Sequence, residues 1–200
     1  MRIVAVIVVL AIAGPARADS FLDLEGGIAA PVGDSNWTNS VGTSPKLAAH
    51  VGALNDDQIG GMLAVDWTPE TTNTTSTSFP GGSTDISAFR FRILAELAFQ
   101  HRITPKLTIS GRAGAGVDIA HASYAVTILG ATSSNADTDT GYAFEFGGGI
   151  WYDVGSTQIG AELALPIGHH SHDADKAGDI AFDYTSYDID LLFGVRLWSH

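Results

Sequence analysis

Cysteine is absent from the 200 residues, which excludes a disulfide framework and a thiolate metal site. Basic residues are scarce, with 10 Lys and Arg against 22 Asp and Glu. No nucleic-acid partner is expected, because phosphate binding requires clustered cations. After the N-terminal segment the chain has no apolar run of the roughly 18 residues that a transmembrane helix needs. Stability must therefore come from packing, hydrogen bonding and the solvent around the chain.

The N-terminal segment MRIVAVIVVLAIAGPARA has the layout of a secretion signal. Arg2 precedes an apolar stretch over residues 3–13, shorter than the roughly 20 residues that cross a bilayer as a helix. Gly14-Pro15 breaks the helix, and Ala16-Arg17-Ala18 fits an A-x-A cleavage site. We predict a signal peptide over residues 1–18 and one domain over residues 19–200; the alternative is a short N-terminal anchor. Removal of the two arginines takes the net charge from −12 to −14.

The C-terminal stretch YDIDLLFGVRLWSH has apolar residues at every second position, with Asp188, Asp190 and Arg196 between them. This period of two places apolar groups on one face of a strand and charges on the other. Eight segments show the pattern, and none shows a helical stripe. They are roughly Ser20–Pro31, Lys46–Leu54, Ile59–Trp67, Ile86–Gln100, Lys106–Val126, Tyr142–Asp153, Thr157–Ile167 and Tyr184–Trp198.

The connections between these segments alternate in length. Three are tight: Asn55–Gln58, His101–Pro105 and Val154–Ser156. The other four are long and polar, and they include GDSNWTNSVGTS, PETTNTTSTSFPGGST, ILGATSSNADTDTG and GHHSHDADKAGDIAFD. An even number of antiparallel strands with short turns at one rim and long loops at the other is typical of a bacterial outer-membrane barrel. We predict an all-β, eight-stranded antiparallel up-and-down transmembrane β-barrel, closed by pairing of the first and last strands.

A soluble barrel would show the same alternation with the apolar face inward, so periodicity alone leaves the orientation open. Three features favour lipid outside. Aromatic residues such as Trp67, Phe99 and Tyr152 lie near the ends of the apolar faces, as in interfacial girdles. The apolar blocks have the roughly 9 to 11 residues that a tilted strand needs to cross a bilayer. The opposite face is rich in glycine, which suits the inside of a narrow barrel.

That opposite face also carries charges of both signs. In an eight-stranded barrel the side chains fill the interior, so we predict Arg-carboxylate networks and trapped water rather than a wide pore. The predicted network consists of Glu25, Lys46, Arg90, Arg92, Glu96, Arg112, Glu145, Glu162 and Arg196, on the same face as Asp23, His50, Asp118, Asp188 and Asp190. The alternative is that these are the surface charges of a soluble sandwich.

The pattern resembles that of small outer-membrane β-barrel proteins, namely the OmpA-like transmembrane domain and its OmpX and OmpW relatives. The most specific local pieces are ITPKLTISGRAGAGVD, residues 103–118, and the C-terminal strand. Gly194 and Leu197 fit the signal with which such proteins close, but Ser199 departs from it and Trp198 is one place out of phase. A bulge, or Trp198 plugging the periplasmic mouth, would explain the departure. The resemblance implies an outer membrane with its lipid and lipopolysaccharide in a Gram-negative bacterium, and the barrel insertion machinery as a partner.

The last long loop contains HHSHDAD, where imidazole and carboxylate groups could bind Zn, Cu or Ni. The candidate ligands are His169, His170, His172, Asp173 and Asp175. The four predicted loops carry nine carboxylates against Lys176 alone, so they should attract divalent cations and basic partners. These carboxylates are Asp34, Glu70, Asp85, Asp137, Asp139, Asp173, Asp175, Asp179 and Asp183. The alternative is a solvated loop surface among metal-bridged anionic lipids.

Three functions fit this sequence. The prediction is a non-enzymatic barrel, without a cofactor, that supports the envelope or acts in surface recognition or adhesion through its loops. A narrow channel or transporter for small, hydrophobic molecules is the alternative that the OmpW resemblance implies. The third function is a lipid A-modifying enzyme, since His121-Ala122-Ser123 resembles the His-x-Ser of outer-membrane deacylases. However, Asp118 and Glu145 point to the other face of their strands, so no carboxylate completes a triad.

Overall fold

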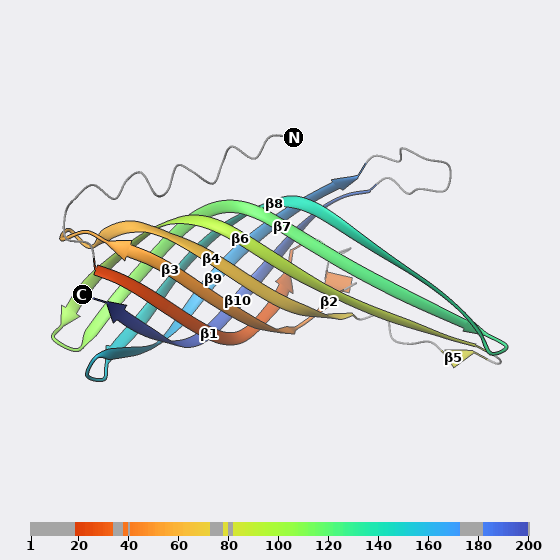
Figure 1. The fold of residues 1–200 in the computed structure, drawn as a ribbon, viewed down its shortest axis with the longest axis horizontal. Helices are drawn as coiled ribbons and strands as arrows, with labels where there is room; N and C mark the ends of the chain where they lie inside the picture. Colours follow the sequence, from red (N-terminus) through yellow and green to blue (C-terminus); the bar gives the residue numbers. More distant parts are fainter. Residues whose placement is uncertain are drawn as a thin grey trace.

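The computed structural model describes residues 19–33, 38–39, 41–72, 78–79, 82–172 and 182–199. The predicted signal peptide, Asp173 and Asp175 lie outside these residues. Figure 1 shows one closed barrel, with the strands tilted to its long axis. The helical residues of the described chain include no segment long and apolar enough to cross a membrane.

Eight long strands form the wall of the barrel. They are β1 (Asp19–Val32), β3 (Ser44–Leu54), β4 (Ile59–Thr72), β6 (Gly82–Thr104), β7 (Leu107–Ile128), β8 (Ala131–Asp153), β9 (Thr157–His172) and β10 (Phe182–Ser199). Two short strands, β2 (Val41–Gly42) and β5 (Ser78–Phe79), pair with β4 and β6. Each long strand is antiparallel to the next, and β1 pairs with β10. The predicted eight-stranded ring and its closure are confirmed.

The three tight turns lie at one end of the barrel, beside the start of β1 and the end of β10 (Figure 1). In the first turn the backbone N–H of Gln58, which has a φ of 62°, donates to the carbonyl of Asn55 over 2.9 Å. The predicted turn over residues 101–105 is shorter than expected, since β6 continues to Thr104. The Thr104 hydroxyl oxygen there accepts the N–H of Leu107 over 3.0 Å. In the third turn, Gly155 has a φ of 84°.

The opposite end differs from the prediction. The segment ILGATSSNADTDTG, residues 128–141, is not a long loop, because β7 and β8 remain paired up to Ile128 and Ala131. Leu129 and Gly130 alone connect them, with φ values of 50° and 82°, the positive values that a two-residue hairpin turn of type I′ requires. β6 pairs with β7 over the same region, so three strands continue beyond the rest of the barrel (Figure 1). The sequence did not predict this extension, because most side chains of residues 131–141 are exposed on both faces of the strand. Such a strand has no alternation of apolar and polar residues.

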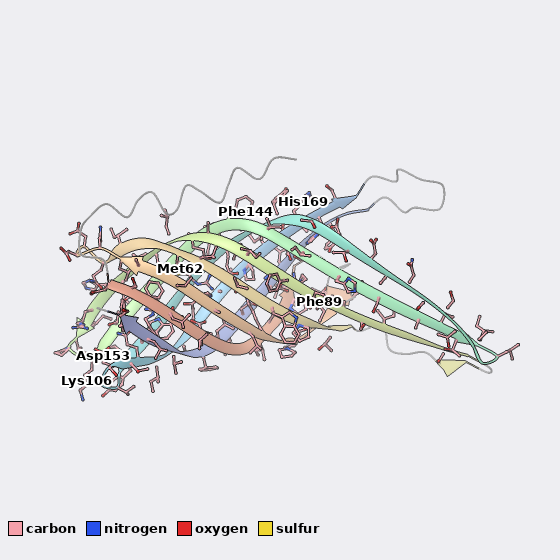
Figure 2. The ribbon with its side chains drawn as sticks, viewed as in Figure 1. Met62, Phe89, Lys106, Phe144, Asp153 and His169 are labelled. Atoms are coloured by element: carbon pink, nitrogen blue, oxygen red, sulfur yellow. The ribbon has the colours of Figure 1, made fainter. Side chains whose placement is uncertain are left out.

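The barrel has its apolar side chains outside. Leu163 is 52% exposed whereas its neighbour Glu162 is 3% exposed, and this contrast is repeated along every long strand of the wall. Phe89 and Phe144, labelled in Figure 2, are likewise exposed on the outer face, at 39% and 46%. An exterior of this kind is stable in hydrocarbon, because apolar groups meet lipid and the strands satisfy each other's backbone hydrogen bonds. The predicted orientation therefore holds for the described chain.

Candidate functional site

The interior of the barrel is the first candidate site, since it concentrates the charged residues. All nine residues of the predicted network are buried, each on a strand whose alternation turns it inward. In total, nine buried carboxylates face five buried Lys and Arg side chains, together with His50 and His170. The interior of the described barrel is thus filled with side chains and has an excess of acid.

Lys46 lies at the centre of the interior and is fully shielded from solvent. Its Nζ is 2.5 Å from Oδ2 of Asp66 and 2.5 Å from Oδ2 of Asp190, and it is 3.7 Å from Oε2 of Glu145. These acids come from β4, β10 and β8, so one ammonium group connects three strands to β3. Charge-assisted contacts of this kind are among the strongest polar interactions in a protein interior.

Arg112 of β7 forms a second cluster. Its Nη1 donates to both carboxylate oxygens of Glu96, over 2.8 and 2.9 Å. Other guanidinium nitrogens contact Glu145 and Glu162. Gly147, which pairs with Arg112 across the strands, makes this possible, because a Cβ at that position would lie 2.8 Å from Nε of Arg112.

Arg90 and Arg92 of β6 share Asp188 of β10 as an acceptor, over 2.6 and 3.1 Å. Arg92 also donates to Asp118, and Arg90 contacts Glu70. The prediction from sequence that Glu70 lies in a loop is wrong. This residue belongs to β4 and its side chain is only 4% exposed.

The turn-side end of the interior is closed by aromatic residues around Arg196. The guanidinium of Arg196 donates to both oxygens of Asp23, each over 2.6 Å, and its central carbon is 4.1 Å from the centre of the Trp151 ring. Phe21 and Trp198 pack on each other with ring centres 5.6 Å apart, and both lie near Arg196. A cavity of about 10 Å³ lined by Phe21, Asp23 and Arg196, among others, has room for roughly one water. Trp198 is out of phase because it turns inward at this mouth.

His50 lies among three acids, a grouping that sequence reasoning did not find. Its Nδ1 is 3.9 Å from Oδ2 of Asp23 and 3.8 Å from Oε1 of Glu25, and its Nε2 is 3.9 Å from Oδ1 of Asp66. Asp23 and Glu25 share a face of β1, and His50 is opposite Asp23 on β3. The spacing of Asp23 and Glu25 was visible in the sequence, but the register that adds His50 was not.

The histidines of the predicted loop metal site do not come together. His169 and His170 are consecutive in β9, so they lie on opposite faces of the strand. His170 is buried and its Nδ1 is 2.6 Å from Oδ2 of Asp139, whereas His169 stacks near Tyr142 on the other face. Two such residues cannot bind one ion. His172 ends β9, and the rest of the proposed ligand set lies beyond the described residues.

His121 and Ser123, the candidate deacylase pair, have separate partners. The ring of His121 stacks on Phe89, and its Nδ1 is 2.8 Å from the hydroxyl of Thr138. The hydroxyl of Ser123 is instead 2.8 Å from that of Ser87. Nothing in this arrangement of the described residues activates the serine as a nucleophile.

The second candidate site is the three-stranded extension. β8 pairs with β9 only from Tyr142, so its residues 131–141 project with β7 as their partner strand. Residues 131–138 are all exposed. At the tip, Leu129 is 89% exposed. The sequence has no Lys or Arg between Arg112 and Lys176, so the β7–β8 part of the extension carries only acidic charge.

Comparison with known proteins supports the fold. No family model matches the sequence, and no curated protein matches it. The crystal structure of Ail, the attachment invasion locus protein of Yersinia pestis, aligns with a TM-score of 0.50 and 14% identity over 90% of this chain and 99% of that chain. Ail in complex with the heparin analogue sucrose octasulfate gives 0.51 and 13%, over 90% and 99% of the chains.

A major outer membrane protein from Thermus thermophilus aligns with a TM-score of 0.54 and 9% identity, over 90% of this chain and 99% of that chain. At these identities the likeness concerns the fold. Together with the apolar exterior, it shows that the chain has the fold of a small outer-membrane β-barrel. The outer-membrane location that the sequence predicted agrees with this fold and with the apolar exterior.

Proposed function

We propose that this protein is a non-enzymatic barrel whose role is recognition at the cell surface, performed by the extension of β6, β7 and β8. The observation that carries the proposal is the hairpin over residues 122–138, which projects beyond the wall on the side opposite the tight turns and is exposed at all of residues 128–138. Eleven residues of β8 beyond the β9 pairing correspond to about 35 Å of strand. A rigid sheet of this length presents a fixed surface, which lowers the entropy lost on binding.

The surface chemistry of the extension indicates the kind of partner. Asp137 provides an exposed acid without a neighbouring Lys or Arg along β7 or β8, and Leu129 places an apolar side chain in water at the tip. The neighbouring Ile128 is 52% exposed, so two adjacent apolar side chains are exposed at the tip. A patch of exposed apolar side chains marks an interaction site. The proposed partner is therefore a protein with a basic surface that includes an apolar pocket. Ail is an attachment protein by its description, and its similar barrel agrees with such a role.

The interior supports recognition rather than conduction. Arg112, Lys46 and Arg92 each contact acids from two or more other strands, and these contacts fill the cross-section of the barrel. The aromatic residues around Arg196 then close the turn-side end. A wide path for solutes would require these groups to separate, which is costly for buried ion pairs.

The test uses the full chain displayed on Gram-negative cells that lack their own adhesins. Retention is measured on immobilised basic proteins, on mammalian cells and on abiotic surfaces. The decisive variant is Leu129→Asn, because Asn-Gly is a preferred type I′ turn and Leu129 already has a φ of 50°. This change removes the apolar tip while it preserves the hairpin. Val154→Asn, in a tight turn at the other end, is the matched control.

We expect cells with the wild-type chain to be retained several-fold more than empty cells on at least one protein surface. Leu129→Asn should lower this retention to the empty-cell level, whereas Val154→Asn should not change it. A second variant shortens the hairpin by deleting residues 123–128 of β7 and residues 131–136 of β8. Because six residues are removed from each strand, Ala122 still pairs with Asp137 and the Leu129-Gly130 turn is retained. Retention that survives both the deletion and Leu129→Asn would refute the proposal.

A further inference from the structure

The group around His50 has unsatisfied hydrogen-bonding capacity deep in the barrel. Neither ring nitrogen of His50 and neither carboxylate oxygen of Glu25 has a hydrogen-bond partner among the described residues. His50 is fully buried and Glu25 is 95% buried, since 5% of its surface is exposed. Buried polar atoms without partners cost free energy, so such a group in a native interior calls for a bound water or a bound ion.

The charges around this group require more positive charge than the side chains supply. Among the described residues, nine buried carboxylates and the nearly buried Glu70 face five Lys and Arg, which leaves at least four negative charges in excess when both buried histidines are neutral. The excess is local: no Lys or Arg of the described chain lies within ion-pair distance of Glu25, whereas Arg196 pairs with Asp23 and Lys46 pairs with Asp66. A cation beside Glu25 would reduce the cost of burying this carboxylate.

We propose that Asp23, Glu25 and His50 bind one divalent transition-metal cation inside the barrel. One donor atom from each residue lies within 4.8 Å of the other two. Nδ1 of His50 is 3.8 and 3.9 Å from the nearest oxygens of Glu25 and Asp23. Ligands of a tetrahedral Zn²⁺ ion at about 2.0 to 2.2 Å are about 3.4 Å from one another. A side-chain shift of roughly 0.5 Å brings His50 to this spacing from each carboxylate. The donor oxygens of Asp23 and Glu25, which lie within 4.8 Å of each other, must also move closer together to complete the site, with water as a further ligand.

The donor set and its surroundings select the type of cation. One imidazole and two carboxylates suit Zn²⁺ or Cu²⁺ better than Ca²⁺ or Mg²⁺, which prefer oxygen ligands alone. Nε2 of His50 faces Oδ1 of Asp66 at 3.9 Å, and Asp66 is in turn held by Lys46. A carboxylate behind a metal-bound histidine is the usual arrangement, because it orients the ring and fixes its tautomer. Arg196 donates one hydrogen bond to each Asp23 oxygen, and each carboxylate oxygen has a second lone pair, so Oδ2 retains one with which it can bind the metal.

The experiment measures metal binding by the full barrel. Protein is freed of metal by a chelator while unfolded, refolded in detergent with or without Zn²⁺, separated from unbound ion and analysed for metal content. Folding of every variant is checked by the shift in gel mobility on heating. The test variants are His50→Asn and Glu25→Gln, and Asp66→Asn tests the supporting carboxylate. His169→Asn is the matched control, because this histidine lies on the other face of β9 from the buried His170.

We expect about one Zn²⁺ per wild-type chain, and a loss of at least tenfold in the affinity of His50→Asn and Glu25→Gln. Asp66→Asn should weaken binding by roughly 10- to 100-fold. The variants His169→Asn and His172→Asn/Asp173→Asn/Asp175→Asn should bind as the wild type does. Loss of binding in the loop variant with retention in His50→Asn would overturn the proposal, as would a wild-type chain that binds no Zn²⁺.

A measurement on the wild-type chain guards against misfolded variants. Cu²⁺ bound during refolding should give an electron paramagnetic resonance spectrum with hyperfine splitting from a single imidazole nitrogen, because His50 is the one histidine in the proposed site. Splitting from two or more nitrogens would place the ion at another group of histidines and refute the assignment.

Discussion

Replacement of Lys46 by Met should strongly destabilise the folded barrel. The ammonium group lies 2.5 Å from both Asp66 and Asp190, 3.7 Å from Glu145, and is fully shielded from solvent. Met retains most of the side-chain volume, so the effect of a cavity is small. The variant leaves three buried carboxylates without their shared cation, which should lower the free energy of unfolding by about 3 to 5 kcal/mol.

The assay is reversible urea unfolding of the barrel in detergent, followed by tryptophan fluorescence. Lys106→Met, in an exposed turn, should change the free energy of unfolding by about 0.5 kcal/mol or less. The double variant Lys46→Met/Asp190→Asn should lose less unfolding free energy than the sum of the two single variants, by about 0.5 to 3 kcal/mol. The reason is that Asp190→Asn removes a carboxylate charge that Lys46→Met leaves unpaired. A loss below about 1 kcal/mol for Lys46→Met, or strictly additive effects, would refute the reasoning.

Two further predictions test the orientation and the closed end of the barrel. Leu163→Arg should cost about 2 to 4 kcal/mol of unfolding free energy in lipid vesicles, because Leu163 faces hydrocarbon; a near-zero effect would contradict the exterior assignment. Gly160→Ala should displace the Trp151 ring, since a Cβ at Gly160 would lie 2.5 Å from Cε3 of Trp151. We expect a changed near-ultraviolet circular dichroism spectrum and a loss of about 1 to 3 kcal/mol, and an unchanged spectrum would argue against this packing.

The predictions from sequence were most accurate where one face of a strand differs from the other. In the segment Thr157–Ile167, Ile159, Leu163 and Leu165 alternate with polar or small residues, and β9 has these side chains on its outer face. The alternation is local, so it does not depend on which strand lies beside β9. Closure by β1 and β10 was predictable because, in an up-and-down sheet with an even number of strands, the first and last strands run antiparallel and their free edges can pair.

The extension and the His50 group were not predictable in the same way. Residues 131–138 are exposed on both faces, so their sequence lacks the period of two and looks like a loop. The grouping of Asp23, Glu25 and His50 depends on the register of β1 against β3, and a shift by one residue would turn His50 outward.

The sequence by itself determined the fold class, the positions of most strands and the face that meets lipid. These properties follow from the chemistry of neighbouring residues, because a side chain's affinity for lipid or water acts at every position of a strand. Only the tertiary structure decided how far β7 and β8 continue past the wall, and which acid meets which cation. Backbone pairing between distant segments sets both outcomes. The β7–β8 pairing places Arg112 opposite Gly147, which leaves room for the Arg112 side chain to contact Glu162, and the β1–β3 pairing places His50 opposite Asp23.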